Sequence, residues 1–157
     1  MKELAEYRTN LVKRLEEAAD AFRAECLKID DPHARLNADG WTVHQVAVHT
    51  RDVNDLVYGL RARRTAVEEN PEFLNFDGAA YMSANYNSSE PLEQVLNRLV
   101  GSVQDLAEFL RALPVEAWSR VSRHTTLGRG LTLQTWVEKD LAHIGEHLET
   151  VKKHKNL

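Results

Sequence analysis

Hydrophobic residues recur every three or four positions along most of this 157-residue chain. An α-helix completes a turn every 3.6 residues, so this spacing places them on one face of a helix. The pattern predicts four long amphipathic helices, at about residues 4–27, 42–64, 89–112 and 132–153. A shorter helical segment is expected around 79–86 and a single helical turn around 115–118.

The second helix has a clearly marked start. Thr42 can accept a hydrogen bond from the backbone at Gln45, and Gln45 can return one, which is the capping-box pattern. Gly128 and Gly130 indicate a loop before the last helix. No segment alternates between hydrophobic and polar residues for long enough to predict a strand. The sequence therefore predicts an all-α protein, a four-helix bundle in one domain spanning residues 1–157.

Composition narrows the classes of function. Hydrophobic residues make up 43% of the chain and charged residues 28%, which is ordinary for a globular protein. The net charge of −4 argues against sequence-independent binding to nucleic acid. No hydrophobic run approaches the length of a membrane span, and the N-terminus lacks a hydrophobic signal segment. A single cysteine, Cys26, excludes a disulfide within the chain. We expect a cytoplasmic protein without a nucleic-acid or membrane partner.

Helix geometry separates the histidines by the direction in which they point. At about 100° per residue, His49 falls within the hydrophobic face of the second helix, and His44 falls about 140° away from His49. The residues that define this face are Val46, Val53, Leu56, Val57 and Leu60. We therefore predict that His49 points into the core and His44 toward water. His143 and His147 are four residues apart, so they lie one above the other on the inner edge of the last helix.

Two imidazoles one helical turn apart can hold one metal ion between them. A third ligand from a neighbouring helix would complete a site with open positions, and His49 is the candidate. The sequence therefore selects His49, His143 and His147 as metal ligands. The alternative is that each is a hydrogen-bonded core residue, which is the commoner role of a single inward-facing histidine. Burial of three imidazoles together is costly unless their nitrogens have partners, and a metal ion supplies one.

The carboxylates and the other histidines have less specific interpretations. Asp52 and Asp140 each lie three residues from a proposed ligand, where they could orient an imidazole or serve as solvated or capping carboxylates. Glu146 completes an H-x-x-E-H pattern of zinc proteases, but it falls about 100° from His147, so we expect a solvated residue. The remaining histidines are predicted at the surface: His33, His124 and His154.

Two segments carry a resemblance to a known family. Residues 40–49 (GWTVHQVAVH) and 140–147 (DLAHIGEH) resemble the DinB-like superfamily, which includes YfiT-like hydrolases and mycothiol-dependent maleylpyruvate isomerases. The resemblance implies a four-helix bundle with an unusual connection order. It also implies a divalent ion, zinc or nickel, held by His49, His143 and His147. Members with known activity use low-molecular-weight thiols such as mycothiol or bacillithiol.

These observations predict a metal-dependent enzyme that acts on a small molecule. Transfer of a low-molecular-weight thiol is the preferred reaction, and hydrolysis comes second. Either would use a thiol or a water activated by the metal. The alternative is a non-catalytic metal-binding or structural bundle that forms a homodimer, because the sequence specifies no general base beyond Asp52, Asp140 and Glu146.

Overall fold

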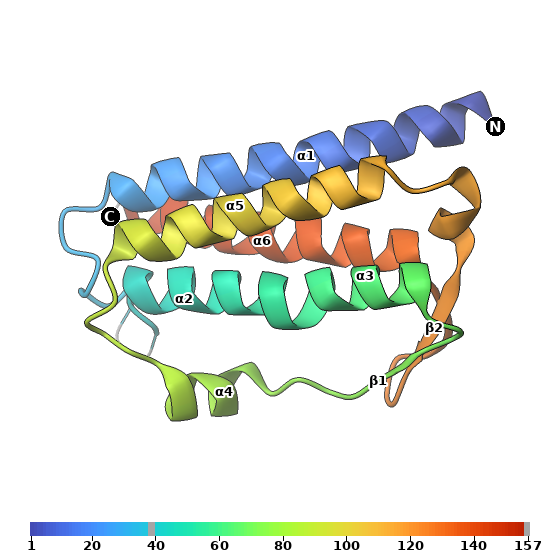
Figure 1. Cartoon of the computed structure of the whole chain (residues 1–157). Coiled ribbons are helices and arrows are strands. Elements are labelled where there is room, and N and C mark those ends of the chain that lie inside the picture. Colours follow the sequence, from blue (N-terminus) through green and yellow to red (C-terminus); the bar gives the residue numbers. More distant parts are fainter. Residues whose placement is uncertain (38–39, 156–157) are drawn as a thin grey trace.

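In a computed structural model that describes residues 1–37 and 40–155, four long helical segments lie side by side around a hydrophobic core (Figure 1). They are α1 (Lys2–Leu27), a continuous run of α2 (Val43–Val53), η1 (Asn54–Tyr58) and α3 (Gly59–Val67), then α5 (Leu92–Arg111) and α6 (Leu133–Lys155). The four predicted long helices are therefore confirmed, with ends that differ by at most three residues. The shorter predicted elements are α4 (Gly78–Asn85) and the 3₁₀ turn η2 (Val115–Ser119).

The order of the helices around the bundle differs from their order in the chain. α1 packs against α5 and α6, and the α2–α3 run packs against the same two helices. α1 and the α2–α3 run are thus consecutive in sequence but lie at opposite corners (Figure 1). Residues 68–91, which include α4, pass along the outside of the α2–α3 run before α5 begins (Figure 1).

The predicted capping box at the start of α2 is present. The Gln45 backbone N–H donates to Thr42 Oγ1 at 3.1 Å, and the Thr42 N–H donates to Gln45 Oε1 at 2.9 Å. These bonds satisfy donors that have no partner within the helix and fix the residue at which the helix begins. The start of α2 sets the rotation of every later side chain, including His49.

The α2–α3 run contains a π-helical turn, which the sequence pattern does not predict. The Gly59 N–H donates to the Asn54 carbonyl, five residues earlier. One extra residue in a turn rotates everything after it by about 100° relative to a regular helix. Leu56 and Leu60, expected on the buried face, are therefore 42% and 43% exposed, while the residue after Leu60, Arg61, is only 7% exposed.

Gly59 is the residue that this turn requires. A Cβ at this position would lie 2.4 Å from the Asn54 carbonyl oxygen, which is backbone and cannot rotate away. The absence of a side chain thus lets the π-helical turn form, and the turn brings Arg61 inward.

A three-stranded sheet at one end of the bundle corrects the prediction that the chain has no strands. β1 (Glu72–Phe73) pairs in parallel with β2 (Val121–His124), which pairs antiparallel with β3 (Gly128–Thr132). The strands have two to five residues, too short to show a clear alternation. Gly128 and Gly130 lie in β3 and adopt positive φ angles of 96° and 73°. The fold is thus mostly helical with a small sheet.

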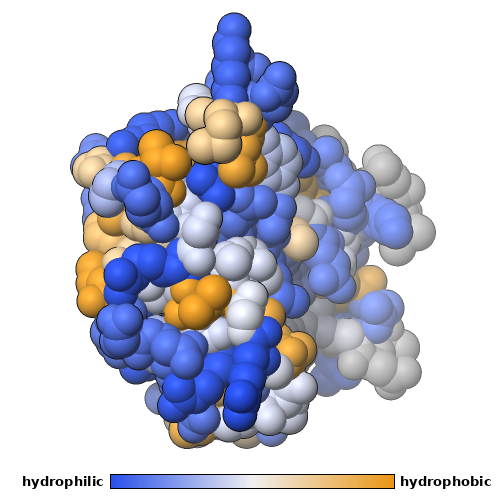
Figure 2. Space-filling view, turned by 90° about the vertical axis from the view of Figure 1, so that its right-hand side faces the viewer, coloured by the Kyte–Doolittle hydropathy of each residue, from blue (hydrophilic) through white to orange (hydrophobic). Residues whose placement is uncertain are grey.

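Hydrophilic residues cover most of the molecule's end that Figure 2 shows, and the hydrophobic areas between them are small and separate. Val115, Val121 and Leu127 are among the exposed large hydrophobic residues. Within residues 1–37 and 40–155, no helix has the length and apolar character needed to cross a membrane.

Candidate metal centre

Three histidines from two helices converge between α2 and α6. His143 Nε2 lies 3.2 Å from His49 Nε2 and 3.0 Å from His147 Nε2. One ring nitrogen from each residue lies within 4.8 Å of the others, and all three rings are partly buried. The structure therefore brings together the three histidines that the sequence selects.

Two neighbours fix the position of the His49 ring. The Trp41 ring, which immediately precedes the cap of α2, meets it edge-on with centroids 5.0 Å apart. On another side lies Gly78, the first residue of α4, where a Cβ would come within 3.0 Å of His49 Cε1. The segment that passes outside the bundle thus packs against a candidate ligand, and its glycine leaves room for the imidazole.

The environment of the cluster keeps all three imidazoles neutral near pH 7. Burial, followed by the neighbouring histidines, lowers the pKa of His49 to about 4 and that of His143 to about 3. Burial also lowers the pKa of His147. A neutral imidazole carries a free lone pair on one nitrogen, which is the form that binds a metal.

Two of the three nitrogen separations are close to those of a tetrahedral metal ion. With zinc–nitrogen bonds of about 2.0–2.1 Å, two ligand nitrogens in a tetrahedral site lie about 3.3 Å apart. The two shortest separations here, 3.0 and 3.2 Å, are close to this value. No hydrogen atom can serve all three facing nitrogens at once, whereas a cation can. Three imidazoles suit either zinc or nickel.

The two predicted orienting carboxylates have different surroundings. Asp140 is fully buried, and among the described residues neither of its oxygens has a hydrogen-bond partner. Burial raises its pKa to about 8, so the side chain is mostly protonated at neutral pH. His143 Nδ1, one turn further along α6, is also buried without a partner in this part of the chain. Asp52 accepts a hydrogen bond from Arg51 Nε at 3.0 Å.

His44 does not point toward water, contrary to the prediction from its helical position. It is fully buried: Nε2 donates to the Glu90 carbonyl at 2.6 Å, and Nδ1 lies 2.6 Å from the Tyr86 hydroxyl. The prediction was wrong because it assumed that α2 has one covered face. Residues 68–91 cover a second face of this helix.

His124 is likewise buried rather than on the surface, with 7% of its area exposed. It is the last residue of β2. The prediction of an exposed His124 was wrong because the sequence pattern did not predict the sheet that buries it. Glu146 is exposed, as predicted, and so is His33.

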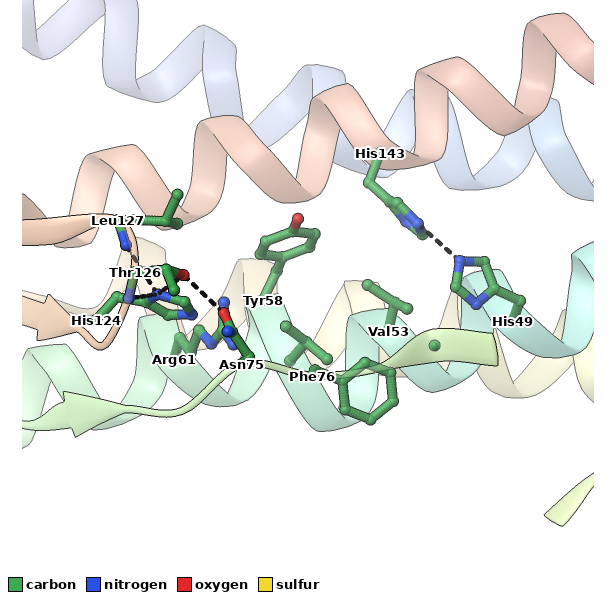
Figure 3. Close-up of a pocket in the computed structure, with 12 residues that line it drawn as sticks. His49, Val53, Tyr58, Arg61, Asn75, Phe76, His124, Thr126, Leu127 and His143 are labelled. Carbon is green, nitrogen blue, oxygen red and sulfur yellow. Dashed lines mark hydrogen bonds between the residues drawn. The ribbon is translucent and has the colours of Figure 1, made fainter. Parts of the chain in front are cut away.

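A pocket of about 270 Å³ opens beside the histidine cluster. His49 and His143 lie at one end of it, and Arg61, Asn75 and His124 lie at the other, with Tyr58 between them (Figure 3). Apolar side chains line the wall between the ends: Val53, Val57 and Phe76. A pocket of this volume suits a small metabolite.

The sequence did not indicate the end of the pocket formed by Arg61, Asn75 and His124. These residues come from α3 after the π-helical turn, from the loop after β1 and from the sheet.

Comparison with known proteins identifies the family. A family model described as the mycothiol maleylpyruvate isomerase N-terminal domain matches residues 8–143. The chain belongs to this family. The resemblance to the DinB-like superfamily is thereby confirmed, and the match to the mycothiol maleylpyruvate isomerase N-terminal domain includes two of the three clustered histidines, His49 and His143. No curated protein matches the sequence.

The fold of this family member is similar to that of a solved structure. YfiT from Bacillus subtilis superposes with a TM-score of 0.87 at 20% sequence identity, over 96% of this chain and 87% of YfiT. YfiT is described as a probable metal-dependent hydrolase with an unusual four-helix bundle topology. This similarity confirms the predicted four-helix bundle.

Proposed function

We propose that this protein is a metal-dependent enzyme that transfers a low-molecular-weight thiol to a small electrophile. In this proposal His49, His143 and His147 hold a zinc or nickel ion. The observation that carries it is the convergence of three neutral imidazoles, two of which, His49 and His143, line one end of a pocket. Three protein ligands are typical of catalytic zinc sites, which keep a position for substrate or water, whereas structural sites are closed by four.

The bound ion would lower the pKa of a thiol or water at its open position, which supplies a nucleophile at neutral pH. In thiol transfer the sulfur forms a bond to an electrophilic carbon, the thiol proton passes to solvent, and the leaving group departs with its bonding electrons. Val53 and Phe76 would hold the reactants away from bulk water. Burial raises the pKa of Tyr58, so its phenol stays protonated and can donate a hydrogen bond to the electrophile.

Hydrolysis is the second candidate, because YfiT is described as a probable hydrolase and the same site could activate water. A non-catalytic bundle is the third, in which the ion only stabilises the fold or a homodimer. A ligand that binds the folded state raises its stability, so a structural ion would produce a large fall in melting temperature when a chelator removes it.

The test is consumption of thiol by metal-free, zinc-loaded and nickel-loaded protein. Mycothiol, bacillithiol and simpler thiols would each be offered with a small alkylating electrophile. We expect a metal-loaded form to consume thiol and electrophile in equal amounts, faster than the metal-free form and faster than the His143→Ala variant. Equal rates in all forms would contradict thiol transfer. Release of acid or alcohol without loss of thiol would identify a hydrolase instead.

A further inference from the structure

Arg61 is a buried cation that pairs with no carboxylate in the part of the chain that the structure describes. Its Nη2 donates to the Leu74 carbonyl at 2.9 Å. Its guanidinium carbon lies 4.9 Å from the centre of the Trp136 ring and 5.9 Å from that of Tyr58. Burial lowers the pKa of this guanidinium, although an arginine remains charged.

These contacts satisfy Arg61 only in part. Cation–π contacts offset some of the cost of burying a charge, but fully buried arginines ordinarily have an anionic partner. Among the described residues, Nε and Nη1 have no hydrogen-bond acceptor. Arg61 lines the pocket, so a ligand bound there could supply the missing acceptor.

His124 presents a second donor at the same end of the pocket. Its Nδ1 accepts hydrogen bonds from the backbone N–H groups of Thr126 and Leu127, both at 3.1 Å. The proton of the neutral ring must therefore be on Nε2. Burial and the adjacent Arg61 lower the pKa of His124, so the ring is neutral at pH 7. Nε2–H has no acceptor within the described residues.

The two ends of the pocket are separated by the length of a small molecule. The His143 and Tyr58 ring centroids are 5.8 Å apart, and Arg61 Cζ lies 5.9 Å from the Tyr58 centroid. The His143 imidazole and the Arg61 guanidinium are therefore no more than about 12 Å apart. Figure 3 shows Tyr58 between the two ends and Asn75 beside Arg61.

We infer that Arg61 and His124 bind the carboxylate of a small acidic substrate whose reacting group lies near His49 and His143. This inference rests on the proposed function, because it assigns the chemistry to the histidine end. A carboxylate matches the planar fork of a guanidinium, and its second oxygen can accept from an imidazole N–H. The pocket thus selects substrates by charge at a distance from the reacting atom.

The test uses 3-mercaptopropionate and 3-mercaptopropionamide, which share a thiol and differ in charge at the other end. Both are titrated into zinc-loaded protein by calorimetry and into zinc-loaded and metal-free protein by ¹⁵N NMR. We expect the acid to bind zinc-loaded protein about tenfold or more tightly than the amide, because hydrogen bonds to a charged group are lost in the amide. In both forms the acid alone should shift the signals of Arg61 Nε–H and His124 Nε2–H.

Three variants separate this role from a structural one. Arg61→Gln should abolish the preference for the acid. Asn75→Asp adds a negative charge at an exposed position and keeps an oxygen that can accept from Thr126. It should weaken binding of the acid several-fold and leave binding of the amide unchanged. Arg63→Gln is the matched control, since Arg63 lies over Phe109 and away from this pocket, and the preference should remain.

Equal binding of acid and amide to the wild type, or a preference that survives Arg61→Gln, would overturn the inference. A larger response of the Arg61 and His124 signals to inorganic phosphate than to the acid would overturn its assignment to a carboxylate. Failure of the proposed function gives a different result: the protein takes up no zinc, while the acid still shifts the Arg61 signal. Failure of the inference alone leaves zinc uptake intact and removes the difference between the two probes.

Discussion

The contact between Gly78 and His49 makes the geometry of the metal centre testable without changing a ligand. In Gly78→Ala, the new methyl group would lie 3.0 Å from His49 Cε1. Carbon atoms in ordinary contact are about 3.5–4.0 Å apart, so the ring or α4 must move by about 0.5 Å. A zinc site tolerates deviations of about 0.2 Å in its bond lengths. We therefore expect zinc affinity to fall about tenfold, or about 1.4 kcal/mol.

The assay is competition for zinc against a chromophoric chelator, with the melting temperature of the metal-free protein measured in parallel. Zinc should still bind at one ion per chain, because His143 and His147 are unchanged. Gly145→Ala is the matched control: it lies between these two histidines, and its Cβ would meet nothing within 4 Å. Alanine there should stabilise α6 by about 0.5–1 kcal/mol and leave zinc affinity unchanged. Wild-type zinc affinity in Gly78→Ala would refute the claim that α4 fixes the position of the His49 ring at the metal centre.

Three further predictions concern the helices that hold the site. Gly59→Ala should lower the free energy of unfolding by about 1–3 kcal/mol in urea denaturation, because its methyl group would overlap the Asn54 carbonyl oxygen; an unchanged midpoint would contradict this. His44→Ala should lower the free energy of unfolding by about 2–3 kcal/mol in the same assay, because it removes two buried hydrogen bonds, and should leave zinc stoichiometry unchanged. His49→Ala should instead weaken zinc binding. Loss of zinc in His44→Ala would contradict these separate roles. For Asp140, the folded pKa of about 8 lies above the unfolded value of about 4. In metal-free protein, the stability that wild type has relative to Asp140→Asn should therefore be greatest below pH 4 and fall as the pH rises to 8; a constant difference would refute this.

The sequence could predict the long helices and the three clustered histidines because both depend on local periodicity. The hydrophobic repeat of α5 continues without interruption, and its central residues Leu96, Leu99 and Val103 are all fully buried. His143 and His147 belong to one helix, so their proximity follows from the helical rise alone. The direction in which His49 points follows from the residue at which α2 begins. The capping box of Thr42 and Gln45 marks that residue in the sequence.

Features that depend on contacts between distant segments could not be predicted in this way. The burial of His44 requires the chain near Tyr86 and Glu90 to return over α2, which no local pattern encodes. From the sequence, Arg61 is a cationic residue near the C-terminal end of a predicted helix. Only the extra residue of the π-helical turn rotates its side chain into the pocket. His124 faces the same pocket through a strand too short to show an alternating pattern.

The central claim is that His49, His143 and His147 together hold a divalent ion. Elemental analysis of protein purified without a histidine tag, wild type beside His143→Ala, tests it most directly. We expect close to one equivalent of zinc or nickel per chain in the wild type and a small fraction of that in the variant, with both proteins folded by circular dichroism. A wild type that retains no metal after dialysis against zinc and nickel, or a variant that retains as much as the wild type, would contradict the claim.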